Sequence, residues 1–352
     1  MKQVIINNRV IASDQPPYII AEVSGNHNGD LNKALKLLEV AKQSGADAVK
    51  IQTYTADTMT IDHDSDDFII KGGLWDGQKL YDLYQWAHTP WEWHQALFAK
   101  AKELGITLFS SPFDETAVDF LETFDVPAFK IASFELTDLP LIRKIAKTGK
   151  PIIMSTGLAN KMEITEAVKT AEENGCEQLI LLHCISAYPT PLAQANVSTI
   201  NALQKDFNTV VGLSDHTLGL MASVTAVALG ACVIEKHFTF DRSEPGPDSA
   251  FSLEPKELSR LCSETKAAWS ALGSANYELK SAEQENIKFR RSIYAVEDIR
   301  QGEKLTDKNI RRIRPGYGLA PAHFPELIEH YVAGEDIARG TPLNWHSIKN
   351  DG

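Results

Sequence analysis

The segment AVKIQ at residues 48–52 carries the pattern that decides the fold: a short apolar run, suited to a buried β-strand, that ends in polar side chains. The same pattern recurs in YIIAE (18–22), ITLFSS (106–111), AFKIAS (128–133), PIIMST (151–156), LILLHC (179–184), VVGLSD (210–215) and CVIEKH (232–237). Helical patterns such as LNKALKLLEVAKQSG (31–45) and WEWHQALFAKAKELG (91–105) separate these runs, and both end in glycine. Eight strand–helix units within about 250 residues predict an α/β fold, a (β/α)8 TIM barrel.

A doubly wound open sheet is the alternative fold, but the loop after the first run, EVSGNHNGD, lacks the G-x-G-x-x-G fingerprint of that class. In a barrel, the carboxyl ends of all eight strands meet at one rim, where active sites of this fold are built. The polar residues expected at that rim are Glu22, Lys50, Gln52, Ser110, Ser111, Lys130, Ser133, Ser155, Ser186, Ser214, His216, Lys236 and His237. Their concentration at strand ends predicts an enzyme active site.

Two segments outside the eight units, one before the barrel and one between two of its strands, have their own character. VIINNRVI (4–11) predicts a hairpin, with asparagines in the turn, that could plug the lower end of the barrel. Residues 53–90 form an unusually long, acidic and aromatic connection on the rim side, which favours a lid or sugar-binding loop over a decorative excursion. The aromatic residues of interest in this lid are Trp75, Tyr81 and Tyr84.

The C-terminal part contains an internal repeat. The pattern E-D-I-x-x-G-x-x-L occurs in residues 297–310 and again in residues 335–348. We therefore expect a barrel domain over residues 1–273, a helical linker over 274–290 and a small domain of two similar halves over 291–352. A domain of about 60 residues is marginally stable alone, so we expect it to dock against a barrel.

Composition limits the function. The 352-residue chain has a net charge of −12, which opposes non-specific binding to nucleic acid or to anionic membranes. No run approaches a membrane span, and the N-terminal residues lack a secretory pattern. The four cysteines are widely spaced, which indicates reduced core residues rather than a zinc site or disulfides, and we expect a cytoplasmic protein.

The two strand lysines predict an anion site. Either Lys50 or Lys130 alone has an equally good structural explanation as an edge or rim residue. Two ammonium groups that both point into a barrel would repel each other unless an anion lay between them. The hydroxyl groups expected to complete a phosphate or carboxylate cradle are those of Ser111, Ser133, Ser155, Ser186 and Ser214.

The two strand-end histidines predict a metal site. A lone buried histidine is usually a core residue, but His216 and His237 end consecutive strands, and Glu22 could approach them across the rim. Imidazole ligands with open positions suit Mn²⁺, Co²⁺ or Zn²⁺; we expect Mn²⁺ first, with Co²⁺ or Mg²⁺ as alternatives. His27 and His183 are rim candidates that could equally lie behind the rim.

Three further residues have a functional and a structural interpretation. Asp215 must point away from His216 on a strand, so we expect it to be structural. Asp248, in a loop after the last strand, could accept a sugar hydroxyl or shape the turn. Arg314, on a loop of the small domain, could reach an active site or remain a surface residue.

These motifs resemble the sialic acid synthase family over essentially the whole chain. The matching segments are AEVSGNHNG, DAVKIQTYT, SSPFD, FKIASFE, MSTG, YPTP, GLSDHT and EKHFT, and RRSIYA and RPGYG resemble the family's C-terminal antifreeze-like (SAF) domain. The resemblance implies that Lys50, Lys130 and the serines 111, 133, 155, 186 and 214 bind phosphoenolpyruvate. It also implies an acetamido sugar as the second substrate, held by Gln52, Glu135, Tyr188, Asp248 and, from the partner subunit of a domain-swapped homodimer, Arg314.

FIIKGGLWDGQKLYDLY (68–84) and HTPWEWH (88–94) resemble the pseudaminic acid branch of this family. Ser186 stands where the sialic acid enzymes carry asparagine, which weakens the transfer of a phosphate contact there. The implied reaction is attack of C3 of phosphoenolpyruvate on the sugar aldehyde, which a metal at His216 and His237 would polarise. Water then adds at C2 and phosphate leaves, with Glu22 or a metal-bound water as the proton-transfer group.

Three alternatives stay open at this point. The same scaffold could make N-acetylneuraminate or legionaminic acid. A related barrel synthase could use a sugar phosphate, but this rim offers few arginines for a second phosphate. A non-catalytic carbohydrate- or ice-binding protein would leave the two lysines, two histidines and serines at strand ends without an explanation.

Overall fold

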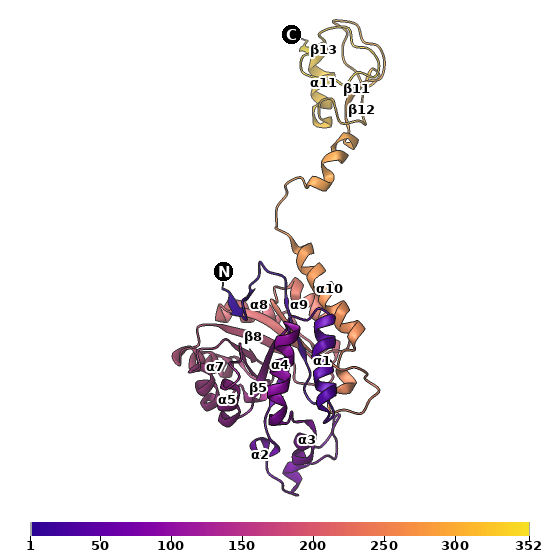
Figure 1. The fold of residues 1–352 in the computed structure, drawn as a ribbon. Coiled ribbons are helices and arrows are strands. Elements are labelled where there is room, and N and C mark those ends of the chain that lie inside the picture. Colours follow the sequence, from indigo (N-terminus) through magenta and orange to yellow (C-terminus); the bar gives the residue numbers. More distant parts are fainter. Residues whose placement is uncertain (1, 352) are drawn as a thin grey trace. The chain divides into compact units, whose positions relative to one another are not determined.

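Eight parallel strands, each followed by a helix on the outside, close into a barrel in the computed structural model, which describes residues 2–351 (Figure 1). Around the barrel the strands are β3 (Tyr18–Glu22), β4 (Ala48–Thr53), β5 (Thr107–Pro112), β6 (Phe129–Ile131), β7 (Ile152–Ser155), β8 (Leu179–Cys184), β9 (Val210–Asp215) and β10 (Val233–His237), and β10 pairs with β3. The outer helices are α1 (Leu31–Gln43), α4 (His94–Leu104), α5 (Glu115–Glu122), α6 (Leu139–Ala146), α7 (Lys161–Glu173), α8 (Thr199–Phe207), α9 (Met221–Ala228) and α10 (Pro255–Leu272). The prediction of a (β/α)8 barrel is confirmed.

Alternation along the strands produces two apolar cores. Residues such as Ile20, Phe109 and Ile153 point inward and fill the barrel, whereas their neighbours in sequence pack outward against the helices. Because both faces of each strand are buried, the strands are apolar runs without an exposed face. Polar side chains on the inner face lie mainly toward the carboxyl ends of the strands; Thr107, at the start of β5, instead accepts a hydrogen bond from Asn7 of the hairpin.

The N-terminal hairpin seals the end of the barrel opposite the rim. It consists of β1 (Val4–Ile6) and β2 (Arg9–Ile11), joined by Asn7 and Asn8 with φ of 47° and 64°. Asparagine tolerates this left-handed conformation, which a two-residue hairpin turn requires. Side chains from both strands join the core inside the barrel, so the predicted plug is confirmed.

The insertion between β4 and α4 folds onto the rim side of the barrel. It contains α2 (Ala56–Met59), the 3-10 turns η1 (Asp66–Phe68) and η2 (Trp91–Trp93), and α3 (Leu80–Ala87). The 3-10 turns in the other rim loops are η3 (Ser133–Glu135), η4 (Leu192–Gln194) and η5 (Ser249–Phe251). The expected strand over 128–133 is shorter in the structure, because the backbone turns into η3 and the Leu136 N–H donates to the carbonyl of Ser133.

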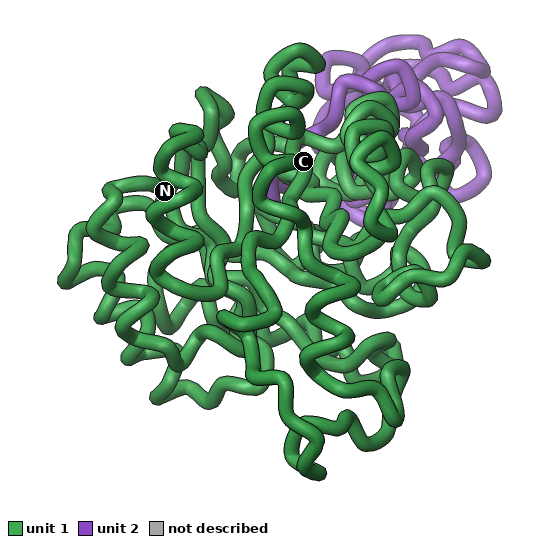
Figure 2. The backbone as a smooth tube through the Cα atoms, turned by 60° about the horizontal axis from the view of Figure 1, so that its bottom comes forward, with its two compact units in different colours: residues 1–273 green, residues 274–352 purple. Residues whose placement is uncertain are grey.

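Residues 274–352 form a second compact unit (Figure 2). Its elements are η6 (Ser281–Phe289), β11 (Ser292–Ala295), β12 (Ile310–Ile313), η7 (Pro321–His323), α11 (Phe324–His330), β13 (Tyr331–Ala333) and β14 (Ile348–Asn350). The two repeats pair reciprocally: the Gln301 N–H donates to Asp336 and the Arg339 N–H to Asp298, both over short distances of 2.7 and 2.8 Å. Equivalent residues of the two repeats thus make equivalent hydrogen bonds, which confirms the internal repeat.

The structure also bears on membrane-spanning helices and on the state of the cysteines. Within residues 2–351, no helix combines the length and apolar character needed to cross a bilayer. Over the same residues the four cysteines are free thiols; Cys184 lies inside the barrel, whereas Cys262 is partly exposed.

Candidate active site

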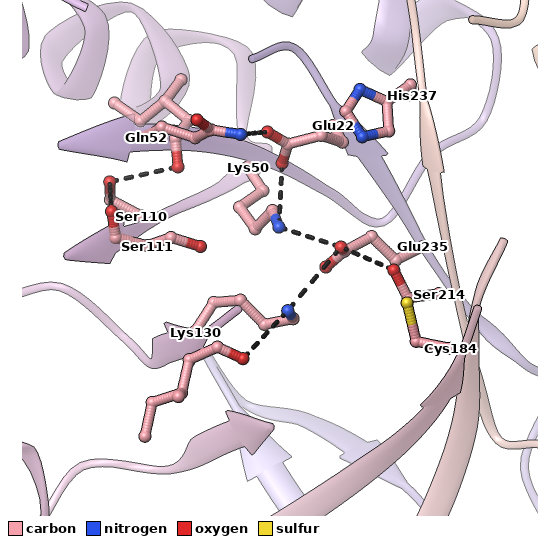
Figure 3. Close-up of polar contacts among 12 residues, drawn as sticks. Glu22, Lys50, Gln52, Ser110, Ser111, Lys130, Cys184, Ser214, Glu235 and His237 are labelled. Carbon is pink, nitrogen blue, oxygen red and sulfur yellow. Dashed lines mark hydrogen bonds and ion pairs between the residues drawn. The ribbon is translucent and has the colours of Figure 1, made fainter. Parts of the chain in front are cut away.

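Side chains from all eight strands converge at the rim of the barrel, and Figure 3 shows those of every strand except β7. Their inward direction follows from the alternation that places Ile20, Ile153 and Leu182 in the barrel core, because residues two positions further along point the same way. The inward polar residues near the carboxyl ends of the strands are Glu22, Lys50, Gln52, Ser111, Lys130, Ser155, Cys184, Ser214, Glu235 and His237. The barrel therefore gathers residues that lie more than 200 positions apart in the sequence.

A chain of alternating charges runs through this cluster. Lys50 Nζ lies 3.2 Å from Glu22 and 2.9 Å from Glu235, and Lys130 Nζ lies 3.9 Å from the same oxygen of Glu235 (Figure 3). Gln52 donates a hydrogen bond of 3.0 Å to the other oxygen of Glu22. All four charged groups are buried, so water screens them weakly and each depends on its neighbours for its charge state.

Burial and the neighbouring charges shift the pKa values of these groups. Burial raises the pKa of Glu22 well above its ordinary value, although Lys50 opposes the shift. Burial would do the same to Glu235, but the ammonium groups of Lys130 and Lys50 outweigh it and lower its pKa. Burial lowers the pKa of Lys130 to about 8, against the attraction of Glu235. Glu235 is therefore the firmly ionised member, and Glu22 is the carboxyl group able to carry a proton.

Glu235 was absent from the residues predicted from the sequence. The expectation was that an outside anion must separate the two lysines, whereas the structure places the carboxylate of Glu235 there. The signal was available, since His237 had been predicted to face the rim and Glu235 precedes it by two residues on the same strand. Cys184 was also missed, because it was taken for a core residue.

The hydroxyl groups of the rim leave unfilled hydrogen-bonding capacity. Ser111 and Ser155 are buried, and neither Oγ has a hydrogen-bond partner within residues 2–351. Ser133 Oγ accepts the Gly157 N–H at 3.1 Å, and a Cβ on Gly157 would overlap both Ser133 and Ser186. Buried hydroxyl groups without partners are costly, so this arrangement fits a site that a ligand completes.

His216 and His237 lie side by side at the ends of β9 and β10. Their ring centroids are 5.4 Å apart, and Tyr188 packs 4.4 Å from the ring of His216. Asp248 lies 3.7 Å from His237 Nδ1. Burial and nearby positive charges hold the pKa of His237 well below its usual range, so its imidazole is neutral.

The histidine pair fits a metal with open coordination positions. His216 Nδ1 lies 3.0 Å from the carbonyl of Ile185, and a carbonyl only accepts, so the proton is on Nδ1 and the lone pair on Nε2. His237 Nδ1 is buried without a hydrogen-bond partner in the described part of the chain. Within residues 2–351, no three histidine, cysteine, aspartate or glutamate side chains group into a complete metal site, and Glu22 pairs with Lys50 instead.

Comparisons with known proteins identify the family of the chain. The model of the NeuB family matches residues 37–277, and that of the SAF domain matches residues 290–349. This chain belongs to the NeuB family. A pseudaminic acid synthase from Campylobacter jejuni is 47% identical over 94% of this chain and 96% of its own length. An N,N'-diacetyllegionaminic acid synthase from the same species is 41% identical, with 88% and 94% covered.

A solved structure agrees with the fold of this NeuB protein. The N-acetylneuraminic acid synthetase of Leptospira borgpetersenii, in complex with citrate, superposes with a TM-score of 0.73 at 33% identity. The match covers 82% of the NeuB chain described here and 96% of the Leptospira chain.

The remaining residues predicted to bind the sugar have different surroundings. Glu135, in η3, has one buried oxygen without a partner, and burial raises its pKa to about 7. Tyr188 and Asp248 border the histidine pair, as described above. Arg314 belongs to the second unit, where it is exposed, and its role stays a prediction.

The lid of the NeuB protein contributes one aromatic residue to the site. The Trp75 ring lies 5.8 Å from that of Tyr188. In contrast, Tyr81 donates to Asp57, and Tyr84 packs on Tyr54 at 5.9 Å, so both stabilise the insertion itself.

Four polar residues near strand ends face away from the interior. Lys236 forms an ion pair of 2.9 Å with Asp215, which confirms the structural interpretation of that aspartate. Ser110 donates to the carbonyl of Ile51. His183 lies 2.8 Å from the carbonyl of Ala195 and thus lies behind the rim.

Proposed function

We propose that this protein is a pseudaminic acid synthase. It condenses phosphoenolpyruvate with 2,4-diacetamido-2,4,6-trideoxy-L-altrose and water, and releases pseudaminic acid and phosphate. The observation that carries the proposal is the pair of buried lysines, Lys50 and Lys130, beside the partnerless hydroxyls of Ser111 and Ser155. Together they form a cradle for a small polyanion, and the 47% identical relative named a pseudaminic acid synthase supports the sugar.

The residues of the cradle and rim act by binding and orientation. Lys50, Lys130 and the serines 111, 133, 155, 186 and 214 hold phosphoenolpyruvate with C3 toward the open-chain sugar, whose hydroxyl and acetamido groups meet Gln52, Glu135, Tyr188 and Asp248. C3 forms the new bond to the aldehyde carbon, and water adds to the cationic C2. The tetrahedral intermediate then expels phosphate by C–O cleavage. Positioning and fixed charge supply most of the rate enhancement.

Glu22 is suited to proton transfer in this scheme. Its buried carboxyl has a raised pKa and lies beside Gln52, one of the proposed sugar-binding residues. A carboxyl group with a pKa near the working pH can both take and return a proton. It is our candidate for the proton that moves during water addition.

A divalent metal, Mn²⁺ in the first instance, would be held by His216 and His237. When bound, it would act as a Lewis acid on the sugar aldehyde. The neutral imidazole of His237 and its partnerless Nδ1 support this assignment.

We further propose a cytoplasmic homodimer in which the small domain of one chain completes the site of the other. The dimer is supported by exposed apolar side chains in the loops after β6, β7, β8 and β9, because such side chains suit contact with a second copy. They are Phe134, Leu158, Leu192 and Leu218. The small domain also exposes Tyr317 beside Arg314. Free thiols in the described residues are consistent with a reducing compartment.

The second candidate is a legionaminic acid synthase, the name of the 41% identical relative, or an N-acetylneuraminate synthase, the activity named for the 33% identical solved structure. The deciding experiment measures phosphate release from phosphoenolpyruvate with a panel of diacetamido-trideoxy and N-acetyl hexoses. We expect the highest kcat/KM for the L-altro diacetamido sugar. A higher value for the legionaminic acid precursor or for N-acetylmannosamine would reassign the substrate, and no phosphate release with any sugar would reject the synthase.

A further inference from the structure

The two oxygens of the Glu235 carboxylate differ in their hydrogen bonding. Its Oε1 lies 2.9 Å from Lys50 Nζ and 3.9 Å from Lys130 Nζ, and accepts from Ser214 Oγ at 3.2 Å. Its Oε2 is buried and has no hydrogen-bond partner within residues 2–351. Only one of the two oxygens is thus held in place.

Asp215, on the neighbouring strand β9, is a buried acid with a structural role, and its hydrogen bonding differs from that of Glu235. Asp215 Oδ1 accepts the Thr217 N–H at 2.8 Å, and its Oδ2 binds Ser223 at 2.6 Å and Lys236 at 2.9 Å. Both of its oxygens are satisfied, as expected for a permanent contact. The half-satisfied Glu235 lies instead where two ammonium groups and the open hydroxyl groups meet.

We propose that Glu235 is a positioning residue that serves as the resident counter-anion of the phosphoenolpyruvate site. The inference rests on the proposed function. In the free protein Glu235 neutralises Lys50 and Lys130 and keeps both ammonium groups inside the barrel. The anionic substrate takes over these contacts, and Glu235 recovers them when phosphate leaves.

The proposal and a purely structural role predict opposite changes in anion affinity when Glu235 loses its charge. Glu235 and, when it is ionised, Glu22 offset the charges of Lys50 and Lys130, so the empty cradle presents little net positive charge. Removing the negative charge of Glu235 leaves an excess ammonium for the ligand when binding is measured at a pH low enough to keep Lys130 protonated, because Glu235 also raises the pKa of that lysine. Anions should then bind more tightly, whereas loss of a merely structural contact would loosen the lysines and weaken binding.

The test measures binding of inorganic phosphate and of phosphoenolpyruvate by isothermal titration to wild-type protein, Glu235→Gln, Glu235→Asp and Asp215→Asn. We expect Glu235→Gln to bind both anions about tenfold more tightly and to turn over more slowly, because phosphate release slows. Glu235→Asp keeps the charge and should bind them no more tightly than wild type. Asp215→Asn, which opens an equally buried ion pair on the outer face, should leave anion affinity unchanged.

Thermal unfolding supplies a second readout. Glu235→Gln should lower the Tm of the free protein, since two buried ammonium groups lose their partner, and phosphoenolpyruvate should raise that Tm by more than it raises that of wild type. If Glu235→Gln does not fold, the comparison is made between Lys130→Met and Lys130→Met/Glu235→Gln, where fewer charges need balancing. The double variant should again bind anions more tightly than its parent.

Unchanged or weaker anion binding by folded Glu235→Gln would overturn the inference alone, provided that wild type binds phosphoenolpyruvate. Failure of the wild-type protein to bind phosphoenolpyruvate would overturn the proposed function, and this inference with it.

Discussion

The indole Nε1 of Trp75 donates a hydrogen bond of 2.8 Å to the backbone carbonyl of Pro247, and thereby ties the insertion after β4 to the loop after β10. Gly25 lies at the same junction, where an added Cβ would come within 2.5 Å of Pro247 and 3.0 Å of Ala87. The ring of Trp75 faces Tyr188, so this side chain brings the insertion to the site.

Trp75→Ala should weaken sugar binding. The indole offers contact area to the methyl and acetamido groups of the proposed sugar, and its loss should raise the sugar KM about tenfold while the phosphoenolpyruvate KM stays constant. Steady-state kinetics with each substrate varied measures both. Tyr81→Phe, which removes a hydroxyl that binds Asp57 within the insertion, is the control and should change neither KM. An unchanged sugar KM in Trp75→Ala would show that the lid only covers the site.

Lys130→Met should weaken phosphoenolpyruvate binding by about 2–5 kcal/mol, the usual loss for a buried charge-assisted contact. Lys50→Met should have a similar effect, and sugar binding should change much less in either variant. Isothermal titration with each substrate provides the comparison. Lys236→Met removes a lysine that is 1% exposed but faces outward, so it should reduce stability without altering the affinity. Unchanged phosphoenolpyruvate affinity in both cradle variants would mean that the cradle is misplaced.

Phosphoenolpyruvate affinity should fall as the pH rises above about 8. Burial lowers the pKa of Lys130 to about 8, so this ammonium is charged at neutral pH and loses its proton through that range. The phosphate group already carries its full charge there, since its second pKa is near 6. Titrations from pH 7.5 to 9.5, above the raised pKa of Glu22 of about 7, should show a progressive loss of affinity. Lys130→Met should lack this alkaline limb; its persistence would assign the limb to another group.

Removal of divalent metal should abolish phosphate release, and His216→Ala and His237→Ala should each lower it more than about 100-fold. Titration with Mn²⁺ should show weakened metal binding in both variants, which separates loss of metal from loss of another function. His183→Ala, a buried histidine behind the rim, is the matched control and should bind Mn²⁺ like wild type. Full activity in chelator, with metal content verified as nil, would remove the metal from the mechanism.

Mixing two inactive variants, Arg314→Ala and His237→Ala, should restore part of the activity. If Arg314 acts on the partner's barrel, a mixed dimer regains one intact site, with His237 from one chain and Arg314 from the other. The measurement is phosphate release after subunit exchange, with exchange followed by a fluorescent label on one variant. No recovery after demonstrated exchange would mean that Arg314 works within its own chain or has no role in the site.

Much of the fold followed from the sequence because its signals are local. Eight apolar runs of strand length, separated by helical periodicity, predicted the barrel, and asparagines at positions 7 and 8 predicted the hairpin turn. Strand-end residues such as Lys50 and His237 could be placed on the rim, because every strand of such a barrel ends on the same side. The end of β6 was predicted less well, since the turn that begins at Ser133 depends on tertiary contacts that include the Gly157 N–H.

The partners of each rim residue were decided only by the closed barrel. Closure brings Glu235 of the last strand next to Lys50 of the second, 185 residues away, and within 3.9 Å of Lys130. No local pattern encodes these distances, because they depend on strand order and on the register around the barrel. The sequence by itself determined which residue types stand at the strand ends, since alternation and strand length are properties of neighbouring residues. The tertiary structure alone decided which charge neutralises which, because Coulomb interactions depend on distance in space and on burial.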